Sequence, residues 1–200
     1  MPLITRPRPV LPLLAALACA PACATYKLAP PDGFVEVSAY KREVRMKAQD
    51  NVGLKLSVFS NVRGGTLGYW SVDLVNKLAP RGYRLIDQAP VTSANGVVGA
   101  RFDFDYTAPG DDQPKFFIVV VFPTDEHLFV LDLAGDKAHA PRYSARVDEI
   151  AGDIKVRGCK LVSKICRGPQ PPRLSTPGPD APTPTAAPVA APAPAAATAS

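Results

Sequence analysis

Residues 115–134, KFFIVVVFPTDEHLFVLDLA, contain two nearly continuous apolar runs separated by a short polar link at residues 123–126. Each run has the length of a strand, and neither alternates between apolar and polar residues as a half-exposed strand does. Continuous apolar runs indicate strands buried on both faces of a sheet. The pair therefore predicts the centre of a sheet covered on both sides, and the short link makes its two strands antiparallel.

Upstream segments extend this sheet with alternating patterns. The Asn95-Gly96 pair is the strongest hairpin turn in the sequence, because this dipeptide suits a type I′ turn. It follows two short predicted strands, YRLIDQ and APVTSA (residues 83–94), and precedes VVGARFDFDY (residues 97–106). Nearer the N-terminus, EVRMKA (residues 43–48) and LKLSVFS (residues 54–60) alternate in the same way and predict a hairpin.

Two segments show helical periodicity. In the first, Thr66 can cap the N-terminus, and Pro80 and Gly82 end the run. Its apolar positions are Leu67, Trp70, Leu74, Val75 and Leu78. The second helix is expected after Pro141, and Gly158 can end it. Its apolar stripe consists of Tyr143, Val147, Ile150 and Ile154. Both stripes need a sheet to cover, which gives Trp70 a structural role.

The order is a hairpin, a helix, a meander of strands and a second helix. It predicts an α+β domain, an α/β/α sandwich with a mostly antiparallel sheet of about six to seven strands and two helices on opposite faces. This order, spanning residues 43–156, resembles the PsbP-like fold of extrinsic photosystem proteins and of bacterial envelope lipoproteins such as the DcrB family. GTLGYWSVDLVNKLAPRGYRL (residues 65–85) and NGVVGARFDFDY (residues 95–106) carry the resemblance. It implies this architecture and a non-enzymatic role, without any site residue.

The N-terminus has the features of a secretory signal. Arg6 and Arg8 precede an apolar run at residues 10–18, which is much shorter than the roughly 20 residues of a membrane-spanning helix. The sequence Ala16-Leu17-Ala18-Cys19 resembles a bacterial lipobox, in which the cysteine becomes the first residue and carries acyl chains such as palmitate. We therefore expect a signal peptide over residues 1–18 and lipidation of Cys19.

Other processing remains open from the sequence. Cys23 is a poorer lipidation candidate, because Pro21 stands where the motif wants a small or aliphatic residue. Cleavage after the A-x-A sequence at residues 22–24 is the alternative, and it would release a soluble periplasmic or secreted protein beginning at Thr25.

The remaining chain divides by composition. After a tether over residues 19–34, we expect the PsbP-like domain over residues 35–158 and a cysteine-bounded appendix over residues 159–167. Residues 168–200 are rich in proline and alanine, contain no aromatic residue and are expected to be a disordered tail.

Cys159 and Cys166 bound the segment CKLVSKIC. An exported chain meets an oxidising compartment, so a local disulfide between them is expected. The segment lacks a C-x-x-C spacing and a nearby histidine, and no metal is predicted here.

A possible patch for an anionic partner lies on the first hairpin. It consists of Lys41, Arg45, Lys47 and Lys55. The formal net charge of +5 includes the two leader arginines. Candidate partners are an acidic envelope polymer, anionic lipid headgroups or an acidic protein, whereas nucleic acid is not expected for an exported chain.

Candidate catalytic and metal-binding residues have plainer explanations. His127 and His139 are expected at the surface, and Ser144 lacks the G-x-S-x-G turn of a nucleophile. Asp103 and Asp105, with Asp111 and Asp112, suggest calcium, but this spacing is more typical of a solvated strand edge. The glycines of NVRGGTLG (residues 61–68) suit a tight strand-to-helix link. No catalytic residue and no cofactor is predicted.

These observations predict a bacterial cell-envelope protein, lipid-anchored to a membrane and facing the periplasm or the exterior. Its expected role is a non-catalytic interaction or assembly module with an envelope protein partner. The alternatives are an envelope binder of a small ligand or ion, or an envelope hydrolase.

Overall fold

The computed structural model describes residues 25–107, 110 and 112–176 of the chain. The strands are β1 (Tyr26–Lys27), β2 (Phe34–Tyr40), β3 (Glu43–Ala48), β4 (Gly53–Ser60), β5 (Arg84–Thr92), β6 (Val98–Tyr106), β7 (Lys115–Pro123), β8 (His127–Asp136) and β9 (Lys155–Val156). The helices are α1 (Leu67–Leu78), α2 (Ala140–Ser144) and α3 (Val147–Asp153), with 3-10 turns η1 (Ala79–Arg81) and η2 (Lys137–His139). None of the described helices has the length and apolar character needed to span a bilayer. The expected signal peptide, Cys19, Cys23 and Asp111 lie outside the described residues.

Seven strands form one antiparallel sheet in the order β2-β3-β4-β8-β7-β6-β5, and β1 pairs with β9 in a separate two-stranded ribbon. The predicted α+β class and antiparallel sheet are confirmed. β7 and β8 are neighbours near the centre of the sheet, as their continuous apolar runs predict. Along β7 successive side chains point to opposite faces of the sheet. Ile118 and Val120 belong to one core, and Val119 and Val121 belong to the other.

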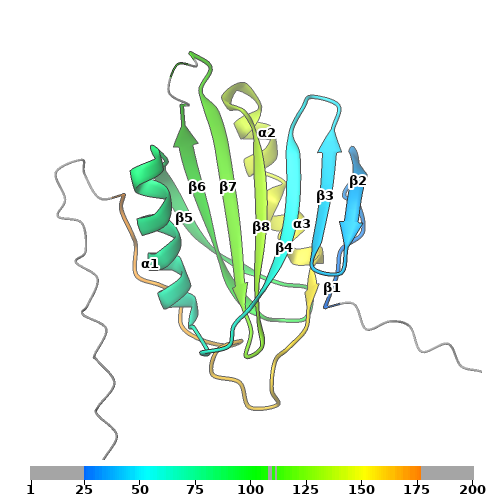
Figure 1. Cartoon of the computed structure of the whole chain (residues 1–200), viewed down its shortest axis with the longest axis vertical. Coiled ribbons are helices and arrows are strands. Elements are labelled where there is room, and N and C mark those ends of the chain that lie inside the picture. Colours follow the sequence, from blue (N-terminus) through cyan, green and yellow to red (C-terminus); the bar gives the residue numbers. More distant parts are fainter. Residues whose placement is uncertain (1–24, 108–109, 111, 177–200) are drawn as a thin grey trace, which may run out of the picture.

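The helices lie on opposite faces of the sheet (Figure 1). One core joins α2 and α3 to the sheet through Tyr143, Val147 and Ile150, which pack with the inward residues of β3, β4, β7 and β8. The other core joins α1 to the sheet through Leu67, Val75 and Leu78. The three expected layers are therefore present, and each helical stripe covers its own face.

Several boundaries differ from those expected. The domain begins earlier than residue 35, because Tyr26 pairs with Val156 and Phe34 is a buried core residue. Residues 84–92 form one strand rather than two, with an irregularity between Leu85 and Asp87. The C-terminal helix is interrupted after Ser144, where the Ser144 carbonyl accepts a hydrogen bond from Arg101 Nη1 at 3.0 Å.

The first residues of the expected tail are ordered against the sheet. Gln170 Nε2 donates to the Gly99 carbonyl at 2.9 Å, and the Leu174 amide donates to Gln88 Oε1 at 3.0 Å. Leu174 also packs on the α1-side core, and Thr176 accepts the Leu85 amide. Residues 168–176 therefore cover the outer edge of β5. The tail prediction relied on average composition, which does not register side chains placed to bind one strand edge.

The appendix is closed as expected by a disulfide between Cys159 and Cys166, whose Cα atoms are 6.1 Å apart. Cys166 is buried in the core on the α2/α3 side, and its carbonyl accepts the Val98 amide at 2.9 Å. The C-terminal end of the appendix is thus attached to the domain through Cys166.

Candidate functional site

Helix α1 covers only part of its face of the sheet. It packs on β6 and β7, and Figure 1 shows none of the described helices over β2, β3 and β4 on this side. Residues of these three strands that alternate with core residues therefore point into the space beside α1. We call the following side chains the open sheet face: Val35, Ser38, Tyr40, Glu43, Arg45, Lys47, Lys55 and Phe59.

The predicted cationic patch lies largely on the open sheet face. Arg45 stands directly opposite Lys55, and Lys47 stands opposite Val35, whereas Lys41 lies in the turn between β2 and β3. The structure thus brings three of the four cations together on one surface.

Two of these cations have partners within the domain. Arg45 Nε is 2.7 Å from Glu43 Oε1, and Lys55 Nζ is 2.9 Å from Asp132 Oδ2. Burial raises the pKa of Asp132, although the ammonium group of Lys55 acts in the opposite direction. Lys55 therefore neutralises a poorly solvated carboxylate, and Lys47 and Lys41 are the members without an ion pair in the described part of the chain.

Strand β2 is an exposed edge of the sheet. Val35, Val37 and Tyr40 are 66%, 65% and 69% exposed, respectively. Among the described strands it pairs only with β3, and its register shifts between Glu36 and Ser38. Such an irregularity limits uncontrolled pairing of an edge. The two sheet edges therefore differ, because residues 168–176 cover β5 while no described strand covers β2.

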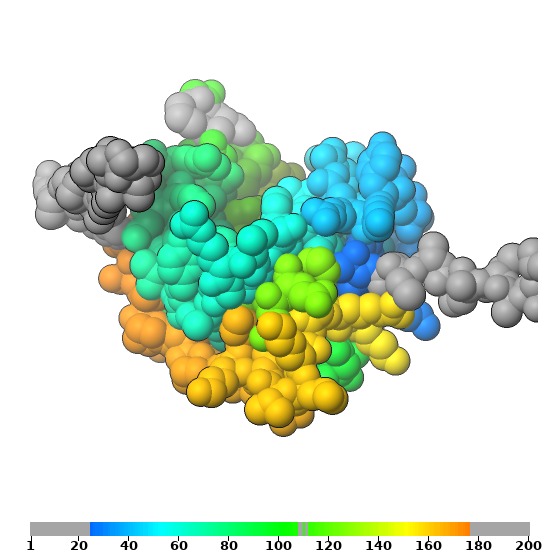
Figure 2. Space-filling model, turned by 60° about the horizontal axis from the view of Figure 1, so that its bottom comes forward, coloured from blue at the N-terminus to red at the C-terminus, as the bar shows by residue number. Residues whose placement is uncertain are grey.

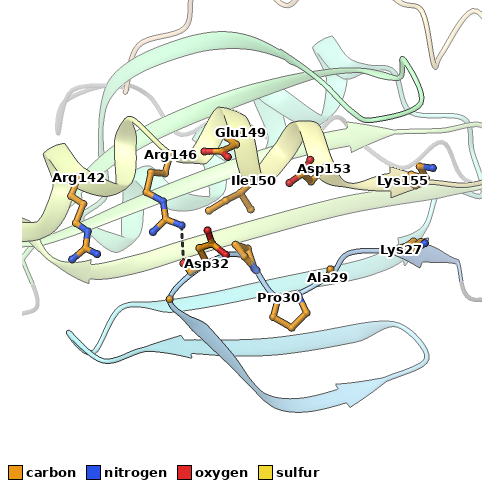
Figure 3. A pocket seen from close by; sticks show the side chains of 12 residues that line it. Lys27, Ala29, Pro30, Asp32, Arg142, Arg146, Glu149, Ile150, Asp153 and Lys155 are labelled. Atoms are coloured by element: carbon orange, nitrogen blue, oxygen red, sulfur yellow. Dashed lines mark hydrogen bonds between the residues drawn. The ribbon is translucent and has the colours of Figure 1, made fainter.

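The cleft of about 730 Å³ in Figure 3 lies between the N-terminal segment and helices α2 and α3. Arg146 extends across it and donates to the Asp32 carbonyl at 2.7 Å. The other charged side chains that line the cleft carry both signs and include Lys27, Glu149 and Asp153. The arrangement joins the N-terminal segment to α3 and presents no nucleophile beside a base among the described residues.

A neighbouring cleft of about 530 Å³ contains Asp50 and Tyr143. The Tyr143 hydroxyl lies 2.7 and 2.9 Å from the two Asp50 oxygens. This hydrogen bond lowers the pKa of Asp50, while burial and then Asp50 itself raise the pKa of Tyr143. Both shifts oppose general-base or nucleophilic use at neutral pH, because they hold the tyrosine protonated and weaken the carboxylate as a base. The pair joins α2 to the turn between β3 and β4.

The histidines and Ser144 occupy separate places. His127 is half-buried, its ring is edge-on to Phe129, and its Nδ1 has no hydrogen-bond partner among the described residues. His139 Nδ1 lies 4.0 Å from Asp50, whereas Ser144 Oγ lies 3.3 Å from Asp103 Oδ2.

The carboxylates that suggested calcium are held by cations. Arg101 binds Asp103, and both Arg84 and Lys137 bind Asp105. The described residues contain no group of three or more candidate metal ligands. Asp103 and Asp105 of β6 therefore belong to ion pairs with Arg101, Arg84 and Lys137.

Two exposed features were missed in the sequence. No strand was predicted over residues 34–40, which form β2. The alternation of Val35 and Val37 with polar residues was a weak strand signal. Leu161 and Val162 stand between Lys160 and Lys164 in the disulfide loop, and this apolar pair within a basic segment was a readable signal.

No protein-family model matches the chain, and no curated protein matches it. Among solved structures, it is similar to cyanobacterial PsbP (CyanoP) from Synechocystis sp. PCC 6803, with 18% identity, a TM-score of 0.48 and coverage of 68% of this chain and 89% of that one. It is also similar to LpqN of Mycobacterium tuberculosis, described as involved in cell envelope biogenesis, with 12% identity, a TM-score of 0.45 and coverage of 66% and 82%.

A third similar structure is PA94 of Pseudomonas aeruginosa, a protein of unknown function described as a putative regulator, with 9% identity, a TM-score of 0.45 and coverage of 66% and 82%. A PsbP structure is thus among the matches, as the sequence resemblance implied. Similarity at this level concerns the fold, and a fold by itself carries no function.

Proposed function

We propose that this protein is a lipid-anchored, non-catalytic module of the bacterial cell envelope that binds an extended segment of a partner protein along β2 and the open sheet face. The observation that carries the proposal is the exposed edge strand β2, with Val35, Val37 and Tyr40 exposed along it.

A bare strand edge offers unpaired backbone groups to a partner strand. An added strand gains affinity from main-chain hydrogen bonds and specificity from the side chains beside it. Here Val35 and Tyr40 supply apolar contacts on the open sheet face, while Lys47 and Lys41 favour a partner segment that contains acidic residues. The opposite edge is closed by the chain's own residues 168–176, so within the described residues β2 is the edge available for pairing.

The ionisable groups of the domain support a non-catalytic role. Asp50 is held by Tyr143, Asp132 by Lys55, and Asp103 by Arg101. Each of these carboxylates therefore has an internal structural partner, and the clefts bring no base to a nucleophile within the described residues.

Export and anchoring are supported by the leader sequence and by the cysteines. The basic start, the apolar run and the lipobox-like Cys19 favour a lipoprotein, and the Cys159–Cys166 disulfide suits an oxidising compartment. The intact mass of the native protein from membranes tests this part directly. We expect a mass fitting acylated Cys19 that rises by two hydrogens on reduction. A soluble product beginning at Thr25 would contradict the anchor.

Site-specific photo-cross-linking in intact cells tests the binding surface. A photoreactive residue at Val37 is expected to capture a discrete partner, and one at Ile86 is the matched control. Ile86 is also an exposed apolar residue on an edge strand, but its strand β5 is the covered edge.

The captured protein must then bind the purified module through the same strand. We expect V35D/V37D to weaken that binding at least tenfold and I86D to leave it unchanged. Equal capture at both positions, or equal affinity of both variants, would contradict the proposal.

A further inference from the structure

Three loops form one end of the molecule, and we call residues 61–66, 124–126 and 157–167 the loop pole. The Asn61 amide donates to the Glu126 carbonyl at 2.8 Å, and the Glu126 amide donates to the Gly158 carbonyl at 3.2 Å. The Lys160 amide donates to Asp125 Oδ2 at 2.9 Å. Figure 2 shows these segments side by side on the face turned forward, in cyan, light green and amber.

The tips of the loop pole carry exposed aliphatic side chains. Val62 is 88% exposed, Val162 is 91% exposed, and Leu161 is fully exposed. These are the most exposed large apolar side chains in the described part of the chain. The loops themselves are held in place, so the exposure belongs to a fixed surface. Gly64 lies beside Ile165 of the disulfide loop, and Asn61 fastens the first loop.

Cations surround these aliphatic tips. Residues 61–66 and 157–167 contain no acidic residue, and the acidic members of the loop pole are Asp125 and Glu126. The basic side chains are exposed and make no ion pair within the described residues: Arg63, Arg157, Lys160, Lys164 and Arg167. Exposed aliphatic residues on loops that also carry exposed cations complement a surface that is negative outside and apolar beneath, although Lys160 also interacts electrostatically with Asp125.

The N-terminal end of the described chain is next to the loop pole. Tyr26 pairs with Val156, and the chain continues from Val156 directly into the disulfide loop. Cys19 precedes Thr25 by a few residues, and an extended chain spans at most about 3.6 Å per residue. An anchor at Cys19 would therefore hold the loop pole within roughly 20 Å of the bilayer. The C-terminal end of the described chain lies at the opposite end of the domain, where Thr176 contacts Leu85 at the start of β5.

We propose that the loop pole binds the surface of an anionic phospholipid bilayer. Val62, Leu161 and Val162 enter the boundary between headgroups and acyl chains, while Arg63, Lys160 and Lys164 contact phosphate groups. This surface is separate from β2 and the open sheet face. The inference goes beyond partner binding, and it uses the proposed anchor only for the direction in which the pole faces.

Vesicle binding of the native full chain tests the inference. Trp70 is the single tryptophan of the sequence and lines a cleft of about 550 Å³ with Val62, so its fluorescence reports on this pole. We expect brominated phosphatidylglycerol to quench Trp70. The variant V62D/L161D should lose most of this quenching. The control V35D/V37D has the same N-terminus and adds the same two negative charges on β2, and it should keep the quenching.

The charges give an independent measurement. Binding to vesicles containing phosphatidylglycerol should weaken roughly fivefold for each lysine removed in K160Q and K164Q. K41Q and K47Q are the matched controls and should change little. Equal binding to phosphatidylcholine and phosphatidylglycerol, or equal quenching in V62D/L161D and the wild type, would overturn the inference.

The failure of either proposal is recognisable. Cross-linking at Val37 reports on the partner surface and does not depend on Val62 or Leu161. Because every vesicle comparison uses chains with the same N-terminus, an unacylated protein would still show the differences between variants. All substituted side chains are exposed, and an unchanged Tm verifies that each variant is folded.

Discussion

The indole Nε1 of Trp70 donates a hydrogen bond to Asn61 Oδ1 at 3.3 Å. The same Asn61 oxygen accepts the Gly65 amide at 2.7 Å, and Asn61 Nδ2 donates to the Thr124 carbonyl at 2.7 Å. One buried amide thus joins the end of β4, the start of α1 and the turn between β7 and β8. Asn61 therefore holds together two of the three loops of the loop pole.

Asn61→Ala should lower the free energy of unfolding by about 2–4 kcal/mol, because it leaves the buried Thr124 carbonyl and the partly buried backbone groups of Gly65 without a partner. Urea unfolding measures this loss. Asn76→Ala is the matched control, since Asn76 is exposed on α1 and should change stability by less than about 0.5 kcal/mol. Similar losses in the two variants would show that the Asn61 hydrogen bonds do not stabilise the domain.

Trp70→Ala should destabilise the domain by several kcal/mol, of order 3 kcal/mol, because the ring packs on the α1-side core. Gly65 lies directly against this ring, because a Cβ atom at residue 65 would clash with the indole Nε1. Tyr69→Ala is the control for losing an aromatic ring from the exposed side of α1. Thermal unfolding compares the two variants, and we expect a clearly lower Tm for Trp70→Ala than for Tyr69→Ala. A wild-type Tm for Trp70→Ala would contradict the structural role of Trp70.

The pair of Lys55 and Asp132 predicts a pH dependence. Because burial raises the pKa of Asp132, its contribution to stability is fully present below the ordinary pKa, about 3.9, and is lost as the pH rises through the raised value. Asp132→Asn should remove this part of the profile. Lys55→Gln should raise the pKa of Asp132 further and extend the loss to higher pH.

Unfolding in urea across a pH series from acidic to neutral measures these profiles. Asp153→Asn removes an exposed carboxylate and is the control. Parallel profiles for the wild type and Asp132→Asn would contradict the effect of burial on Asp132.

The disulfide between Cys159 and Cys166 closes a loop with a sequence separation of 7. Closing a loop of this size restricts the unfolded chain and is worth about 2–3 kcal/mol on the chain-entropy model. C159S/C166S should lose about this much stability, and a reductant should have the same effect on the wild type. Stability that is insensitive to both changes would show that the disulfide does not stabilise the domain.

The central layers of this fold were predictable because their residues repeat a pattern locally. The apolar runs of β7 and β8, the Asn95-Gly96 turn and the stripe of α1 each carry their information within one segment. Asn61 and Thr124 are 63 residues apart, and their hydrogen bond has no local signal. The open sheet face was also beyond prediction, because it depends on where α1 lies across the sheet.

The cationic patch illustrates the same limit. Lys47 and Lys55 were identified from strand alternation, which correctly places them on one surface. The sequence did not indicate that Lys55 meets Asp132 on β8, because that contact depends on β4 pairing on its other side with β8, which lies far away in the sequence. Strand order therefore decided which cations remain available to a partner.

The edge of β5 is covered by the first residues after the disulfide loop. Residues 168–176 donate and accept hydrogen bonds at Gln88, Gly99 and Leu85, and Leu174 adds an apolar contact with the core below α1. A chain ending after Arg167 should therefore expose this edge, lose roughly 2 kcal/mol through the uncovered Leu174 and lower the Tm. A chain ending after Thr176 is the control and should keep the wild-type Tm. Hydrogen exchange at the Leu85 amide gives the local measurement, with faster exchange expected only in the shorter chain. If both truncations exchange and melt alike, the segment is an unstructured tail, and both edges of the sheet are then open to partners.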